Sequence, residues 1–205
     1  NKSIALLLSG NYQDGWPEYE WRLRCKDYNC RKFIQPQWDG GSLNNRSLLV
    51  HAEQGFGDTI QFVRFLPMVQ SKGGRVIFEC QQALLPLLKN CAGFDEILEN
   101  VPAREPSVNF DLHVPLLSLP GIFGTTMDTI PSDVPYITVD SELLAEWRKR
   151  LEHDKFFKIG LVWAGRPSSN YVYANRSRTL NDFSLLTEIP GLTFYTLQKG
   201  LASVE

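Results

Sequence analysis

The stretch from Ser47 to Pro67, SLLVHAEQGFGDTIQFVRFLP, constrains the fold of this chain more than any other. It begins with a short apolar run at residues 47–52, which is partly β-branched and predicts a buried strand. A glycine turn follows at residues 53–58, and apolar residues then recur at helical spacing over residues 60–66. A strand, a glycine turn and a helix in this order form the opening unit of an α/β nucleotide-type fold.

Two glycines and one acidic residue make this turn a candidate ligand site. Gly55 and Gly57 permit backbone angles that side chains forbid, and they allow a ligand to approach the main chain. The following helix points unpaired N–H groups at whatever lies above the turn. Asp58 stands at the helix start, where its carboxylate either caps the first turn or acts on a substrate. The sequence leaves both roles open.

The composition indicates a globular protein. The 205 residues suffice for one large domain or two small ones, and 43% of them are hydrophobic and 21% charged. The formal net charge of -2 gives no general attraction to nucleic acid or to an anionic membrane. No apolar run approaches the roughly 20 residues that span a bilayer. We therefore expect no nucleic-acid partner and no transmembrane segment.

The N-terminus and the cysteines predict a cytoplasmic setting. Residues 1–10 resemble a short signal-peptide core, but they lack an initiator Met and a cleavage-type small-residue site, so we expect the cut edge of a longer protein. The cysteines form no C-x-x-C pair, and they lie far from the histidines in sequence. We expect free buried thiols in a reducing cytoplasm and no metal site. The four cysteines are Cys25, Cys30, Cys80 and Cys91.

The pattern divides the chain into four segments. The two helical patterns at the start require Pro17 near the first turn of the second helix. A polar connector follows, in which we expect Trp38 to be a packing anchor. The segments are a helical hairpin at residues 1–24, the connector at residues 25–46, an α/β domain at residues 47–140, and a linker helix with a truncated second α/β domain at residues 141–205.

Alternating strands and helices predict a parallel sheet with helices on its faces. Ser141 is the expected cap of the linker helix. His51 and His113 lie within apolar runs, where a satisfied core histidine is commoner than a catalytic one. The expected strands are residues 47–52, 75–80, 94–98, 111–115, 157–163 and 192–197.

Four segments of the sequence together resemble a known family. HAEQGFGDTIQF (residues 51–62) looks like the first loop of bacterial tetratricopeptide-repeat proteins that carry a heptosyltransferase-like glycosyltransferase domain. GWPEYEWR (residues 15–22), GLVWAG (residues 160–165) and LQKG (residues 197–200) fit the same group, so the resemblance covers nearly the whole chain. It implies the GT-B architecture of two facing Rossmann-like domains. The acceptor-side domain comes first, the donor-side domain begins at residue 141, and a tetratricopeptide-like remnant precedes both.

The resemblance assigns the glycine turn to the acceptor. In that family an Asp in the G-x-G-D turn is thought to act as general base on the acceptor hydroxyl, a role that maps onto Asp58. Glycosyl transfer does need a carboxylate within hydrogen-bond reach of the attacking hydroxyl. Glu53 either assists this step or pairs with Arg64. The acceptor-side loop is Glu53, Gln54, Gly55 and Gly57.

The resemblance places the donor diphosphate at the start of the second domain. Small residues, hydroxyls and guanidinium groups, which phosphate recognition uses, gather there. Lys199 follows a strand, at the edge where open α/β sheets bind ligands. The alternative is a solvated loop whose cations contact water. The candidates are Gly165, Arg166, Ser168, Ser169, Arg176, Arg178 and Lys199.

These features predict a metal-independent glycosyltransferase without a cofactor, which moves a sugar from a nucleotide-sugar donor to a hydroxyl of a sugar, lipid-linked or protein acceptor. We expect this piece to be inactive by itself, because half of the donor site is missing. The alternative is a non-catalytic protein that binds protein partners through upstream helical repeats. A third hypothesis is an NAD-type oxidoreductase in which Glu79 imitates the ribose-binding acid, although the third glycine is absent.

Overall fold

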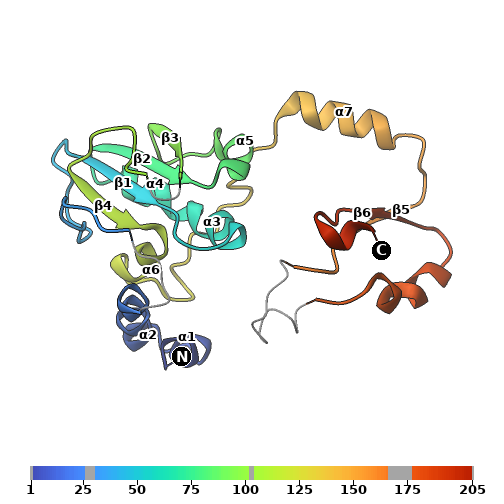
Figure 1. Cartoon of the computed structure of the whole chain (residues 1–205), viewed down its shortest axis with the longest axis horizontal. Coiled ribbons are helices and arrows are strands. Elements are labelled where there is room, and N and C mark those ends of the chain that lie inside the picture. The colour runs from blue at the N-terminus through green and yellow to red at the C-terminus, as the bar shows by residue number, and fades with distance from the viewer. Residues whose placement is uncertain (1, 26–30, 102–103, 166–176, 205) are drawn as a thin grey trace. The chain divides into compact units, whose positions relative to one another are not determined.

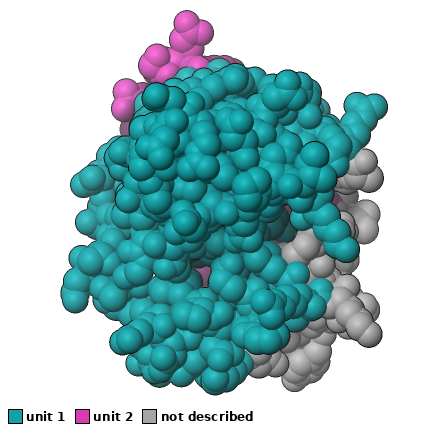
Figure 2. Space-filling model, turned by 90° about the vertical axis from the view of Figure 1, so that its left-hand side faces the viewer, with its two compact units in different colours: residues 1–139 teal, residues 140–205 magenta. Residues whose placement is uncertain are grey.

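The computed structural model describes residues 2–25, 31–101, 104–165 and 177–204. The chain forms two compact units, residues 1–139 and residues 140–205 (Figure 1; Figure 2). Among the described residues, no helix is long and apolar enough to cross a membrane.

Unit 1 is built on a four-stranded sheet in the order β3-β2-β1-β4. All three strand pairings are parallel, which confirms the expected parallel α/β sheet. The chain moves from β1 outward to β3 and then crosses back to place β4 on the other side of β1, an order compatible with a Rossmann-like sheet. The strands are β1 (Ser47–His51), β2 (Arg75–Cys80), β3 (Glu96–Glu99) and β4 (Leu112–Pro115).

Short helices connect these strands and pack on one face of the sheet. Leu48, Val50 and Phe78 on this face are fully buried in the main core. Pro67 and Pro86 each occupy the first turn of a helix, where a missing N–H costs nothing. The helices are α3 (Phe56–Phe62), α4 (Leu66–Gln70), α5 (Leu85–Leu88) and α6 (Leu119–Ile122), with 3₁₀ turns at Val63–Phe65, Gln82–Leu84 and Leu116–Ser118.

The connector closes the free edge of β4. Trp38 N donates to His113 O at 2.8 Å, and His113 N donates to Pro36 O at 3.2 Å, so the connector pairs with β4 as a short bridge. Pairing of this kind blunts an edge that would otherwise offer unpaired backbone groups. Trp38 is 3% exposed and packs against Phe123, which confirms it as a packing anchor.

The connector also covers the second face of the sheet. Phe33 packs against a small cluster that includes Leu49 and Phe110. Its ring lies 5.2 Å from that of His51 and 4.7 Å from that of His113, and the two histidines approach within 3.4 Å (Nε2 to Nδ1). Burial lowers the pKa of His51 to about 3, with His113 and Arg31 acting in the same direction. His51 is therefore a neutral core histidine, as its sequence context predicts.

The N-terminal helices pack tightly against each other and lie beside α6 (Figure 1). Gly15 is buried, and a Cβ there would lie 2.6 Å from Leu7 Cδ2. Asn11 caps the second helix by accepting from Asp14 N. Pro17 is consequently the sixth residue of that helix and lies outside its first turn, contrary to the sequence-based prediction. The helices are α1 (Lys2–Leu8) and α2 (Tyr12–Tyr19), followed by a 3₁₀ turn at Glu20–Arg24.

The described part of unit 2 contains one long helix and a two-stranded parallel sheet. Asp140 caps the helix by accepting from Glu142 N and Leu143 N, so the cap is one residue before the expected Ser141. Trp147 on this helix is 49% exposed. The elements are α7 (Ser141–Leu151), β5 (Phe157–Leu161), a 3₁₀ helix at Leu180–Glu188, β6 (Leu192–Thr196) and a 3₁₀ turn at Leu201–Val204.

The low pKa of His51 predicts acid sensitivity. The folded protein keeps this ring neutral down to about pH 3, whereas the unfolded chain takes up a proton near pH 6.5. Its contribution to stability is therefore lost as the pH falls between these values, by about 1.4 kcal/mol per pH unit for one proton. We expect His51→Gln to flatten the pH dependence of the unfolding free energy, measured by urea titration between about pH 4 and pH 6.

His153→Gln is the matched control, because the His153 side chain is 90% exposed. It should leave the slope unchanged. A slope that His51→Gln does not alter would contradict the neutral, buried state of this ring.

Candidate functional site

The candidate site lies at the carboxyl edge of the unit 1 sheet, where β1 and β4 end. β1 is the point at which the strand order reverses, and open α/β sheets bind ligands at such a point. The glycine turn follows β1 directly. Gly55 has φ −76° and ψ 172°, an ordinary extended conformation, and neither turn glycine has a positive φ. The prediction of unusual backbone angles is therefore wrong. Gly57 instead leaves open space: among the described residues, apart from its chain neighbours and the backbone of its own helix, no heavy atom lies within 4 Å of the position of a Cβ.

Asp58 occupies the first turn of α3. Its Oδ2 accepts a hydrogen bond from Gly55 N at 3.0 Å, which is a capping contact. The side chain is only partly buried. The structure therefore contains the capping role of Asp58, and its carboxylate is directed toward Gly55 N.

A buried ion cluster joins the N-terminal helices to the glycine turn. Arg22 Nε and Nη2 donate to Glu53 Oε1 at 3.0 and 2.6 Å, and Nη1 donates to Glu20 Oε1 at 2.5 Å. Ser118, just after β4, accepts from Arg22 Nη2 at 2.8 Å and donates to Glu20 Oε2 at 2.9 Å. The side chains of Arg22 and Glu53 are only 8% and 6% exposed. This cluster therefore occupies the edge between β1 and β4.

The predicted pairing of Glu53 with Arg64 is wrong, because Glu53 pairs with Arg22 in the ion cluster. Arg64 instead donates to Pro131 O and lies over the ring of Tyr136. Burial alone would lower the pKa of Arg22, but the carboxylates of Glu53 and Glu20 outweigh it and raise that pKa above its usual value. Arg22 is therefore a permanently charged, desolvated partner of Glu53.

Gln54 extends the network along the turn. Its Nε2 donates to Tyr19 Oη at 3.1 Å, and its carbonyl accepts from Gln81 Nε2 at 2.7 Å. Thr59 on α3 donates to Gln81 Oε1 at 3.0 Å. These contacts link α2, the glycine turn and the residue that follows β2. The turn is thus held by polar contacts to α2 and to the residue that follows β2.

Glu79 cannot serve as a ribose-binding acid in this arrangement. Its side chain is 2% exposed, and its carboxylate pairs with Arg31 of the connector. Burial raises its pKa, and Arg31 opposes that shift. The NAD-type hypothesis thereby loses the acid on which it depended.

The described donor-side candidates come together where β5 and β6 end. Gly165 N donates to Ser177 Oγ at 3.2 Å, and Arg178 N donates to Trp163 O at 2.8 Å. These bonds bring the two ends of the loop beside each other. Lys199 is exposed just after β6. Four further candidates lie outside the described residues: Arg166, Ser168, Ser169 and Arg176.

Sequence reasoning missed Gln198 as a positioning residue. Its Oε1 accepts from Trp163 N at 3.0 Å and Ala164 N at 2.9 Å, and its Nε2 donates to Ala164 O and Lys199 O. The amide therefore joins the residues that follow β5 to the residue that follows β6. The sequence shows only a single amide side chain, Gln198, after the last predicted strand. Its position does not reveal that it bonds to Trp163, 35 residues earlier.

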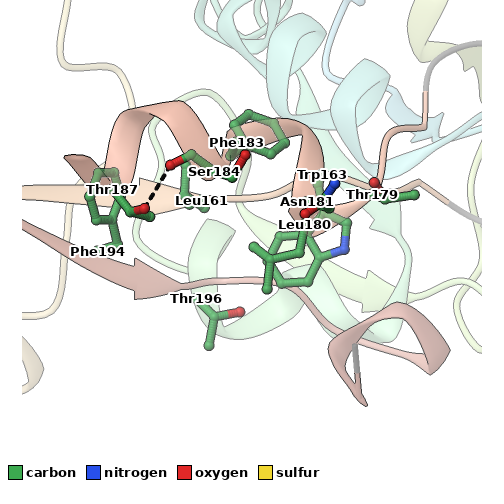
Figure 3. Close-up of a pocket in the computed structure, with 10 residues that line it drawn as sticks. All are labelled: Leu161, Trp163, Thr179, Leu180, Asn181, Phe183, Ser184, Thr187, Phe194 and Thr196. Carbon is green, nitrogen blue, oxygen red and sulfur yellow. Dashed lines mark hydrogen bonds between the residues drawn. The ribbon is translucent and has the colours of Figure 1, made fainter. Parts of the chain in front are cut away.

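Unit 2 also has a cavity of about 700 Å³ between its sheet and the 3₁₀ helix. Figure 3 shows the aromatic and aliphatic side chains that line this cavity, together with the polar side chains of Asn181 and Ser184. The volume falls in the range of small-molecule sites, roughly 300–1,000 Å³. Across the described parts of both units, no group of three or more His, Cys, Asp or Glu side chains is placed to hold a metal ion.

Comparisons with known proteins identify a distant relative. The chain is 26% identical over 220 residues to Protein FlbA of Caulobacter vibrioides, an alignment that covers 97% of this chain and 36% of that protein. The chain therefore spans about a third of the length of this relative. No protein-family model and no solved structure matches.

The ion cluster predicts a large effect of removing Arg22. Arg22→Met would leave Glu53 buried without its guanidinium, which costs about 3–5 kcal/mol for a buried pair. Arg75→Met is the matched control, because the Arg75 side chain in its pair with Glu96 is 54% exposed. Exposed pairs contribute about 0–1 kcal/mol. Urea unfolding measures both variants, and equal, small losses would contradict the importance of the buried cluster.

Proposed function

We propose that this chain is part of a metal-independent glycosyltransferase of the GT-B, heptosyltransferase-like type. It would move a sugar from a nucleotide-sugar donor to a hydroxyl acceptor. One observation carries the proposal: in each unit, the predicted site residues that the structure describes lie beyond the carboxyl ends of parallel strands. Ligands of open α/β sheets bind at that edge. The resemblance described above assigns the acceptor to the first unit and the donor to the second.

The acceptor step would use Asp58 as general base. Its carboxylate would take the proton of the acceptor hydroxyl while that oxygen attacks the anomeric carbon of the donor. The open space at Gly57 supports this role, since it gives an acceptor access to the first turn of α3. Glu53 is engaged by Arg22 and would act by fixing the turn rather than by taking the proton.

The donor step would need positive charge on the departing diphosphate. Arg178 and Lys199 are both exposed. Arg178 N donates to Trp163 O, and Trp163 N donates to Gln198, the residue before Lys199, so hydrogen bonds through Trp163 connect the segments that carry the two cations. The bond between the anomeric carbon and the diphosphate oxygen would break as the acceptor attacks, and these cations would stabilise the negative charge that remains. Such stabilisation requires no metal ion.

A second candidate function is a non-catalytic interaction protein. It is favoured by the capping contact of Asp58 and by the ion cluster, which gives the polar groups at the edge of the sheet a structural role. The two hypotheses differ in one requirement. Only the glycosyltransferase requires turnover that depends on the Asp58 carboxylate.

Paired substitutions in the complete protein test the proposal. Asp58→Asn keeps an oxygen that can accept from Gly55 N, so the cap and the fold should persist. We expect turnover to fall by about 10²–10⁴ while nucleotide-sugar affinity stays nearly unchanged. Arg178→Ala should weaken nucleotide-sugar binding. Isothermal titration with UDP-, GDP- and ADP-sugars measures affinity, and release of the nucleoside diphosphate measures turnover.

Arg148→Ala is the control for lost positive charge, because Arg148 is an exposed residue of α7. It should leave affinity unchanged. Equal loss of turnover and binding in Asp58→Asn would reduce Asp58 to a helix cap. Absence of nucleotide-sugar binding in the wild-type protein would favour the interaction protein.

A further inference from the structure

We propose that Gln81 is a positioning residue for the Asp58 carboxylate at the glycine turn. Gln81 directly follows β2 and belongs neither to the turn nor to α3. The family resemblance assigns it no role. Its effect on turnover rests on the proposed function, whereas its positioning of the carboxylate does not.

The peptide group between Gln54 and Gly55 connects Gln81 to Asp58. Its carbonyl oxygen accepts a hydrogen bond from Gln81 Nε2 at 2.7 Å. Its N–H, which belongs to Gly55, donates to Asp58 Oδ2 at 3.0 Å. A peptide group is planar, so a bond that sets the direction of the carbonyl also sets the direction of the N–H. Gln81 therefore determines where one oxygen of the Asp58 carboxylate is held.

The same amide group of Gln81 also holds the residue after Asp58. Gln81 Oε1 accepts from Thr59 Oγ1 at 3.0 Å, and Thr59 is 1% exposed. The amide makes both bonds at once because its nitrogen donates and its oxygen accepts. Its orientation is determined, since the backbone carbonyl of Gln54 can only accept. One side chain thus ties the segments before and after Asp58 to the end of β2.

The support comes from the rigid part of unit 1. Cys80, directly before Gln81, is fully buried, and its carbonyl accepts from Asn100 N at 2.7 Å. Gly55 and Gly57 in the turn are exposed. A buried strand end thus holds an exposed turn, which keeps the carboxylate in place before a substrate arrives.

Tyr19 also contacts Gln54, but it acts less directly on Asp58. Its hydroxyl accepts from the side-chain amide of Gln54, not from the peptide group. The rotatable bonds of the Gln54 side chain separate that contact from the backbone. Of the two neighbours, Gln81 is therefore the one that sets the direction of the peptide group.

This arrangement gives the two carboxylate oxygens different tasks. The bond from Gly55 N engages Oδ2 of Asp58. Oδ1 is then the oxygen that would take the proton of the acceptor hydroxyl in the proposed reaction. A carboxylate that loses its fixed direction would transfer this proton less efficiently, because the reaction depends on the orientation of the reacting groups.

The order of the turn is measured without any substrate, by ¹⁵N relaxation of the Gly55 N–H in the 205-residue chain. Gln81→Met removes both hydrogen bonds of the amide and keeps the length of the side chain. We expect the order parameter of Gly55 to fall from about 0.85, the value of rigid backbone, to below about 0.6. Gln82→Met is the matched control, because Gln82 is an exposed glutamine directly beside Gln81. It should leave the order parameter unchanged.

A second variant separates the two bonds and remains informative if Gln81→Met does not fold. Gln81→Glu keeps an acceptor for Thr59 but loses the donor to Gln54 O at neutral pH. It should lower the order parameter of Gly55 as Gln81→Met does. An unchanged order parameter in a folded Gln81 variant, with folding verified by its melting temperature, would overturn the proposal.

Turnover of the complete protein tests the consequence. Gln81→Met should lower kcat about 10–100-fold and leave nucleotide-sugar affinity nearly unchanged. Added to Asp58→Asn, it should cause no further loss, because the two residues act in one step. A further loss in the double variant, or an unchanged kcat in Gln81→Met alone, would overturn the positioning role.

The two measurements distinguish this proposal from the proposed function. A disordered Gly55 in Gln81→Met, in a protein whose wild type has no turnover, would support the positioning of Asp58 and contradict the transferase. Turnover that depends on Asp58, with Gly55 ordered in both Gln81 variants, would support the transferase and overturn the role of Gln81.

Discussion

The buried ion contact between Arg22 and Glu53 is the interaction on which the organisation of unit 1 depends. It joins a residue just after α2 to the first residues of the glycine turn, across 31 positions of sequence. Desolvating both charges is costly, and Glu20, Ser118 and the backbone carbonyl of Tyr19 offset part of that cost by accepting further hydrogen bonds from the Arg22 guanidinium. The N-terminal helices are thereby part of the edge at which the sheet would bind a ligand.

The same contact also supports the glycine turn, and unit 2 has a comparable support. Fixing Arg22 also positions Tyr19, over whose ring the guanidinium lies at 4.5 Å. Tyr19 in turn contacts Gln54 of the glycine turn and Trp16 of α2, so the turn and the second N-terminal helix share one support. In unit 2 the Gln198 amide has the corresponding role, because it joins the segments that follow β5 and β6. In both units a buried polar side chain sets the geometry of an otherwise irregular loop.

Local sequence patterns predicted the sheet well and its polar contacts poorly. The apolar run at Arg75–Cys80 has the bounds of β2, because a buried parallel strand leaves a continuous apolar signature. The predicted partner of Glu53, Arg64, was wrong, because Arg64 is close in sequence whereas the true partner, Arg22, is not. The cap of α7 was displaced by one residue, because Asp140 and Ser141 are both good caps. Spacing identifies faces and turns, whereas partners distant in sequence depend on how the elements pack.

The most direct test of this account is native-state hydrogen exchange of two backbone N–H groups in the wild-type protein. One belongs to Gly15, which is buried in α2 and donates to Asn11 O, and the other to Val50, which is fully buried in β1. If the ion cluster makes the helices and the sheet one cooperative body, both amides should exchange with the same free energy of opening. A much lower value for Gly15, with Val50 still protected, would show that the helices open independently and would contradict the central role of Arg22.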